Sequence, residues 1–241
     1  VVGGGRSDDN ITDWCLEQFH SKYGPDLTKD DIWNYIYGVM HAPDWRSRYR
    51  YDLQRNLPRI PLAEEFKAFC VAGRELMDLH TGYETCEEAK ITCVVDGRTI
   101  VDGKPVQTGL FQDDSELPPE VFRIEKKMSL EQDKGTDTWT LKINDRCSLV
   151  EIPKRAFDYK ISGRSPLEWA VDSLRLKEDR NSGIIDDPNG WHVWADDPFK
   201  LIRHLRRCVF IGIRSAEIID SLPPSLANHM NCESPGGEKQ R

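Results

Sequence analysis

The chain has 241 residues, of which 31% are charged, and its formal net charge is −8. Its longest apolar runs reach only a few residues, whereas about 18 are needed to cross a bilayer, which excludes a membrane-spanning protein. The negative total argues against a protein that coats nucleic acid generally, because affinity for DNA depends largely on neutralising phosphates.

The start of the chain and its cysteine usage indicate a cellular setting. The chain begins at Val1, without an initiator methionine, and lacks the basic start and apolar core of a signal peptide. We therefore expect a segment of a longer polypeptide, located in the cytoplasm. The seven cysteines and six histidines are scattered, with no C-x-x-C, H-x-E or H-E-x-x-H arrangement. This pattern favours reduced thiols over a disulfide framework or a metal site.

The first third of the chain has the apolar spacing of helices. Thr28 and Asp31 have the spacing of a capping box, and the apolar residues behind them recur at helical intervals. Pro43 ends this helix and Pro58 ends the next, because proline cannot continue a helix from within. We expect three helices here, at about 28–42, 44–57 and 62–80.

From about residue 87 the pattern changes to alternating apolar and polar residues separated by turn dipeptides. Asp96-Gly97 and Asp102-Gly103 are typical of tight hairpin turns. The stretch 111–120 is acidic and contains two adjacent prolines, which indicates a loop. We predict short antiparallel strands at 91–95, 121–124 and 138–143.

Two helices are predicted in the last third. Ser165 followed by Pro166 is a favourable helix start, because proline at the first helical position lacks an N–H that would be unpaired anyway. The last helix is expected from about Asp197 to Asp220, with a basic side in solvent. Its buried residues would be Ile202, Leu205, Val209 and Gly212, and its solvated arginines Arg203, Arg206, Arg207 and Arg214.

Together these elements predict an α+β chain with four parts. Residues 1–9 are expected to form a linker or to be disordered, and 10–86 to form a helical subregion. Residues 87–222 would form a mixed subregion with short antiparallel strands and a long C-terminal helix. Residues 223–241 are polar and glycine-rich, which is typical of a disordered tail.

Several separated stretches, in the same order, resemble one known family. They include DDIWNYIYGVMHAPDWR at 30–46, LPRIP at 57–61, AGREL at 72–76 and GRSPLEW at 163–169. Together with 182–184, 187–189 and the closing helix, they resemble the region after the methyltransferase core, and the C-terminal specificity region, of type ISP restriction-modification enzymes. The resemblance covers about 10–222 and is loosest in the strand-rich middle.

The resemblance implies a long parent protein that joins a nuclease, a helicase-like translocase and an adenine methyltransferase to this target-reading region. Such a parent would use ATP, Mg²⁺ and S-adenosylmethionine. This chain has no G-x-x-x-x-G-K-[ST] phosphate loop and no [ND]-P-P-aromatic motif, so we expect neither cofactor nor catalysis here. The implied partners are double-stranded DNA and the methyltransferase and coupler domains of the same polypeptide, which the helical subregion would brace.

Sequence-specific DNA reading requires cations on phosphates and forked or amide side chains on base edges. Two zones contain such residues. The first zone consists of Arg46, Arg50, Arg55 and Arg59, in a stretch opposed only by Asp44 and Asp52. The second zone consists of Lys154, Arg155, Tyr159, Lys160, Arg164, Arg175, Lys177, Arg180 and Asn181. The alternative for the first zone is a solvated face or packing against the methyltransferase.

Two other functions are left open. The chain could be a structural coupling module whose arginines form interdomain salt bridges and contact DNA little. Asp114 with Glu125-x-Lys127 has the residue order of a magnesium-dependent nuclease, but its spacing is loose and such matches are common in a charged chain.

The tryptophans are expected to be mainly structural. Trp33, Trp45 and Trp169 lie on apolar stripes, which predicts that they belong to the core. Trp191 and Trp194 follow Gly190 in a predicted loop, where they could stack on bases or cover the core.

Overall fold

The computed structural model describes residues 10–54, 59–105, 117–179 and 181–226. The chain divides into two compact units, which we describe separately: unit 1 is Val1–Asp78 with Ile218–Arg241, and unit 2 is Leu79–Glu217. The sequence predicted subregions at 10–86 and 87–222, and the limits of the two units differ from these. That the predicted subregions are separate domains remains a prediction.

The described part of unit 1 is helical, as predicted. Its helices are α1 (Asp13–Tyr23), α2 (Lys29–His41), α3 (Pro43–Arg48) and most of α4 (Phe66–Thr81), with a 3₁₀ turn at Asp52–Gln54. The capping box of Thr28 and Asp31 begins α2, as expected. The helix predicted over 44–57 is wrong in length, because α3 ends at Arg48. Repulsion between like charges at i and i+4, as at Arg46 and Arg50, disfavours a longer helix there.

Helices α2 and α4 contact each other backbone to backbone at two glycines. A Cβ atom at Gly38 would lie 2.2 Å from the Phe69 carbonyl oxygen, and one at Gly73 would lie 1.8 Å from the Asn34 carbonyl oxygen. No side chain fits at such distances. Around this contact the core of unit 1 packs Ile32, Tyr35, Val39, Trp45, Phe66 and Phe69.

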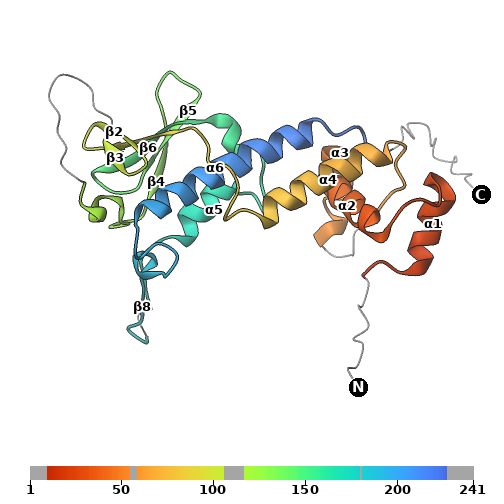
Figure 1. Ribbon diagram of the computed structural model, residues 1–241, viewed down its shortest axis with the longest axis horizontal. Helices are drawn as coiled ribbons and strands as arrows, with labels where there is room; N and C mark the ends of the chain where they lie inside the picture. Colours follow the sequence, from red (N-terminus) through yellow and green to blue (C-terminus); the bar gives the residue numbers. More distant parts are fainter. Residues whose placement is uncertain (1–9, 55–58, 106–116, 180, 227–241) are drawn as a thin grey trace, which may run out of the picture. The chain divides into compact units, whose positions relative to one another are not determined.

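The core of unit 2 is built on an antiparallel sheet (Figure 1). Its strands are β1 (Thr92–Val95), β2 (Arg98–Val101), β3 (Lys104–Pro105), β4 (Ser129–Gln132), β5 (Thr138–Lys142) and β6 (Cys147–Pro153). The strand order is β3-β2-β1-β6-β5-β4. Helices in both units and a sheet in unit 2 confirm the α+β class.

Two of the three predicted strands are confirmed, as β1 and β5. The strand predicted over 121–124 is wrong: Pro119–Phe122 form a 3₁₀ helix that buries Val121 and Phe122. Pro119 at its start favours this, because its φ is already helical and it has no N–H to donate to a sheet. The central strand β6 was not predicted. Glu151 has a φ of 61°, and this break in the strand disturbs the alternation that would have indicated it.

Helices α5 (Pro166–Ser173) and α6 (Phe199–Asp220) begin as predicted, and Ser165 caps α5. Ile202, Leu205 and Val209 of α6 are buried in one core with the sheet residues. A Cβ at Gly212 would lie 2.4 Å from the Ala156 carbonyl oxygen, which explains the glycine there. Strands β7 (Lys177–Glu178) and β8 (Ile185–Asp186), which were not predicted, form a separate hairpin. In the described part of the chain, no helix is long and apolar enough to cross a membrane.

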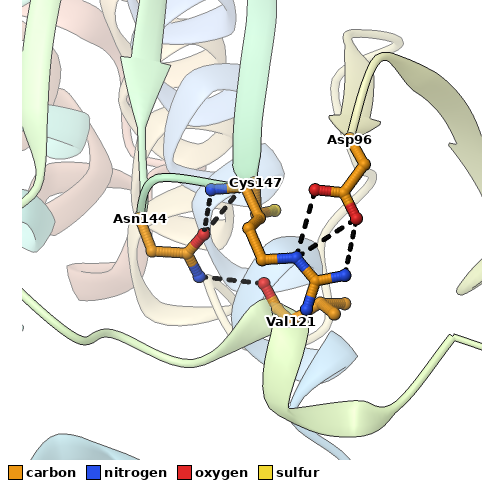
Figure 2. Close-up of polar contacts among 5 residues, drawn as sticks. Asp96, Val121, Asn144 and Cys147 are labelled. Atoms are coloured by element: carbon orange, nitrogen blue, oxygen red, sulfur yellow. Dashed lines mark hydrogen bonds and ion pairs between the residues drawn. The ribbon is translucent and has the colours of Figure 1, made fainter.

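The turn between β5 and β6 is organised by one buried amide (Figure 2). The Asn144 side-chain oxygen accepts hydrogen bonds from the backbone N–H groups of Arg146 and Cys147, both at 2.8 Å. Its side-chain nitrogen donates to the carbonyls of Val121, at 2.9 Å, and Arg123, at 2.8 Å. Asn144 therefore satisfies four backbone groups and fixes the 3₁₀ segment to the sheet.

We expect Gly73→Ala to destabilise the protein by about 2 to 4 kcal/mol, because the new methyl group must separate α2 from α4. Alanine is normally the better helix former by about 1 kcal/mol, so the steric effect has to exceed that gain. Urea denaturation followed by circular dichroism measures the change. Gly190→Ala is the control, because a Cβ there meets nothing within 4 Å, and an equal loss in both variants would contradict the packing argument.

Asn144→Ala is expected to cost about 2 to 3 kcal/mol in the free energy of unfolding, since it leaves several buried backbone groups without partners. Its neighbour Asp145 forms an exposed ion pair with Lys126, and exposed pairs contribute little to stability. Asp145→Ala is therefore a control in the same turn. Similar unfolding midpoints for the two variants would show that Asn144 does not organise this turn.

Candidate nucleic-acid interface

The first zone lies on and beside α3 in unit 1. Arg46 and Arg48 belong to α3, Arg50 follows it, and all three are exposed, as is Arg59. The buried Trp45 indole donates a hydrogen bond of 3.0 Å to the Arg59 carbonyl, which holds the Arg59 backbone beside α3. We call Arg46, Arg48, Arg50 and Arg59 the α3 basic surface. The predicted residue Arg55 lies outside the described residues.

Of the two acids in this stretch, Asp52 is exposed and Asp44 is hydrogen-bonded to another segment. Asp44 accepts hydrogen bonds from the backbone N–H groups of Ser225 and Leu226, at 2.7 and 3.0 Å, and from the Ser225 hydroxyl at 2.8 Å. Burial raises the pKa of Asp44, but these bonds and one from its neighbour's N–H outweigh it and lower that pKa. Within the described ranges no carboxylate forms an ion pair with Arg48, Arg50 or Arg59, so these three guanidinium groups are available to an anion.

The second zone lies in unit 2 and contains more ion pairs. Arg155, on the 3₁₀ turn Lys154–Phe157, pairs with Asp158 at 2.9 Å. Asp172 on α5 pairs with two arginines, Arg164 at 2.8 Å and Arg175 at 3.7 Å. Lys154 and Lys160 are exposed. Exposed ion pairs of this kind contribute about 1 kcal/mol or less, so a phosphate can replace the carboxylate.

Tyr159 does not fit its predicted role. Its side chain is 3% exposed, and its ring stacks on His80 with 5.2 Å between ring centres. His80 in turn contacts the buried Ser215 hydroxyl at 2.8 Å. The assignment of Tyr159 to the DNA surface is therefore corrected: it belongs to the core of unit 2, where its apolar ring is removed from water.

The tryptophans depart from the prediction in two places. Trp45 is in the core as expected, but Trp33 and Trp169 are 45% and 41% exposed. The Trp169 indole donates to the Ile161 carbonyl at 2.9 Å, and the Arg164 guanidinium lies 5.0 Å from the ring centre. Of the loop pair, Trp194 is buried and stacks against the more exposed Trp191. A helical stripe does not reveal whether a neighbour covers all of it, and here only part is covered.

The remaining residues of the second zone belong to the β7–β8 hairpin. Lys177 is on β7 and Asn181 is in the turn, and both are exposed. The backbone N–H of Asn181 donates to Asp179 at 2.9 Å. Arg180 lies outside the described residues. The first zone belongs to unit 1 and the second to unit 2, so each stands as a separate candidate surface.

Three arginines predicted to be solvated on α6 are instead packed. Arg206 and Arg207 pair with Glu88, and Arg203 pairs with Asp102. The guanidinium groups of Arg203 and Arg206 also lie over the Phe199 ring. Sequence periodicity placed them correctly on the polar side of the helix, but it gives no information about the acidic segments that cover that side.

The described residues form no arrangement that supports the nuclease alternative. Asp114 lies outside the described residues, while Glu125 and Lys127 are exposed in a segment without regular structure. Among the residues with defined positions, no three His, Cys, Asp or Glu side chains are grouped to hold a metal ion.

Three solved structures are similar to this chain. A nuclease-deletion mutant of the type ISP restriction-modification enzyme LlaGI, in complex with a DNA substrate mimic, is 32% identical with a TM-score of 0.63, and the match covers 82% of this chain and 14% of that one. The ATP-dependent type ISP restriction-modification enzyme LlaBIII bound to DNA is 28% identical with a TM-score of 0.68, covering 88% and 12%. A DrdV–DNA complex is 26% identical with a TM-score of 0.68, covering 89% and 20%.

The chain therefore spans a fifth or less of the length of these proteins. None of the curated proteins compared with it matches. The family described as the type ISP C-terminal specificity domain matches residues 3–204, which is most of the sequence. Because this match covers most of the sequence, the chain belongs to the family of type ISP C-terminal specificity domains.

Proposed function

We propose that this chain recognises a short sequence in double-stranded DNA on behalf of a longer restriction-modification polypeptide. The observation that carries the proposal is the α3 basic surface, where Arg48, Arg50 and Arg59 are exposed and have no carboxylate partner among the described residues. Family membership supports it, as do the similar structures, which are complexes with DNA or a DNA substrate mimic.

In this proposal the two zones have different tasks. The α3 basic surface contacts phosphates, which fixes position on the duplex without reading sequence. The second zone, in unit 2, adds Lys154, Lys160 and the Asp172-paired arginines as phosphate contacts, and the β7–β8 hairpin adds Lys177 and Asn181. The chain's negative total is compatible with this, because affinity depends on the local distribution of charge.

The chemistry belongs to the rest of the parent in this proposal. The chain positions DNA for an adenine methyltransferase and for a translocase and nuclease, which use S-adenosylmethionine, ATP and Mg²⁺ in the cytoplasm. Its other partners are the methyltransferase and coupler domains of the same polypeptide.

A structural coupling module is the second candidate, favoured by the number of arginines in unit 2 that already pair with carboxylates. Competition binding with the full chain separates the two. A recognition module prefers one duplex sequence from a random pool, whereas a coupler binds all duplexes weakly and equally.

The double variant Arg48→Ala/Arg50→Ala is expected to lower affinity for every duplex by about tenfold at low salt. Because each phosphate contact contributes about 0.9 to the slope of log affinity against log salt, that slope should fall by about 2. The control is Lys67→Ala/Arg74→Ala, which removes two exposed cations from α4 of the same unit. Equal effects of the two double variants would indicate a general charge effect and no α3 contact.

Asp172→Asn tests the second zone by a change that should raise the affinity for DNA. Removing this carboxylate releases Arg164 and Arg175 for phosphate, so affinity for any duplex should rise by about two- to tenfold. Asp196→Asn removes the same charge from an exposed pair with Lys200 in the same unit and serves as the control. If Asp172→Asn binds DNA no better than this control, the two arginines do not contact DNA.

A further inference from the structure

The β7–β8 hairpin is exposed on both of its faces. Every described residue from 175 to 187 is exposed, and none belongs to either hydrophobic core. Figure 1 shows the hairpin extending away from the sheet and helices of unit 2. Since isolated two-stranded hairpins are only marginally stable in water, this one needs support from its base and its turn.

The base of the hairpin is fixed to unit 2 by Asn189. Its side-chain oxygen accepts from the Ile124 N–H and its side-chain nitrogen donates to the Ile124 carbonyl, both at 2.8 Å. Asp187 accepts from the N–H of Asn189 at 2.9 Å and from its side chain at 2.8 Å. The buried Trp194 indole donates to the Pro188 carbonyl at 2.6 Å. The hairpin therefore leaves unit 2 from a rigid anchor.

The turn is organised by a second carboxylate. Asp179 accepts from the backbone N–H groups of Asn181 and Ser182, both at 2.9 Å. The hydrogen bond from Ser182 is the largest cause of the lowered pKa of Asp179. Gly183 has a φ of 70° and donates to the Asp179 carbonyl at 2.8 Å. Asn181 uses only its backbone in these bonds, and within the described residues its side-chain amide has no partner.

The side chains on the hairpin suit a partner with polar edges and apolar groups. Ile184 and Ile185 are 67% and 64% exposed, and an exposed apolar side chain can contact a thymine methyl group. Asn181 adds a free amide. Arg175 and Lys177 add positive charge at the base and on β7.

Most acidic side chains of the hairpin accept hydrogen bonds from the hairpin itself or from its base. Asp179 and Asp187 hold the turn and the base, and Asp186 accepts from the Trp191 indole at 3.4 Å. Glu178 remains exposed, and a glutamate can accept from the cytosine amino group. An approach to duplex DNA therefore requires Arg175 and Lys177 to contact the phosphates, while the four carboxylates, which keep their charge, lie away from the DNA backbone.

We propose that the β7–β8 hairpin enters the major groove of the DNA duplex, where the Asn181 amide and Ile184 contact base edges. A two-stranded ribbon fits that groove, and it presents donors, acceptors and thymine methyl groups that distinguish the base pairs. This inference rests on the proposed function and adds to it: the hairpin supplies sequence preference, while the α3 basic surface supplies affinity common to all sequences.

The test uses the full chain. A preferred duplex is first selected from a pool with a randomised centre, and binding to it and to a random duplex is then compared for Asn181→Ala and Ile184→Thr. The control is Val101→Thr, which changes an exposed β-branched residue in β2 of the same unit, 54% exposed. Circular dichroism and the unfolding midpoint verify that each variant is folded.

We expect Asn181→Ala to lower the ratio of specific to random binding by about ten- to a hundredfold, the range for one lost bidentate base contact. Ile184→Thr should lower the ratio by a smaller factor, because threonine keeps one methyl group for the apolar contact. Affinity for the random duplex and its salt slope should stay within about twofold of the unchanged chain, as should all properties of Val101→Thr. Folded hairpin variants that keep the full preference would overturn the inference and leave the proposed function standing. An unchanged chain that selects no sequence would overturn the proposed function itself.

Discussion

The backbone contact between α2 and α4 at Gly38 and Gly73 is the constraint on which the geometry of unit 1 depends. The two helix backbones can come this close only where both residues lack a side chain, so Gly38 and Gly73 determine which turns of α2 and α4 meet. Because α2 ends at His41 and Pro43 begins α3 directly afterwards, that register also sets where α3 starts. The position of α3, and with it that of the arginines proposed to contact phosphates, therefore depends on the absence of side chains at Gly38 and Gly73.

Carboxylates serve distinct purposes in the two zones. Asp44 and Asp179 bind backbone N–H groups and so organise a chain segment and a turn. Asp172 binds two arginine side chains. A carboxylate that is satisfied by backbone donors adds structure and forms no competing ion pair, whereas one bound to guanidinium groups competes directly with phosphate. The formal charge of a segment does not distinguish these cases.

Local signals predicted much of the helical structure. The capping box at Thr28, the helix start at Ser165-Pro166 and the buried side of α6 depend on residues close together in sequence, and all three were found as expected. The central strand β6 was missed because the positive φ of Glu151 interrupts its alternation. The β7–β8 hairpin was missed because a strand exposed on both faces has no apolar period.

The candidate site was less predictable, for a physical reason. Charge and position identified cations, but burial and pairing are set by residues distant in sequence. Tyr159 is covered by His80, and Arg206 and Arg207 are paired with Glu88. The arginines of α3 are exposed, and Asp44 beside them is bound by Ser225 and Leu226, a contact that no local pattern indicates.

That contact has a consequence for how the protein is made. Unit 1 is formed by two separate segments of the chain. Asp44 is in the first segment, so it can bind Ser225 and Leu226 only after α6 has been synthesised. While the ribosome is still translating unit 2, the Asp44 carboxylate is free to pair with the neighbouring guanidinium groups of α3. Any such pair is exchanged for the backbone N–H groups of Ser225 and Leu226 when unit 1 completes its fold, so this end of unit 1 reaches its native hydrogen bonding late.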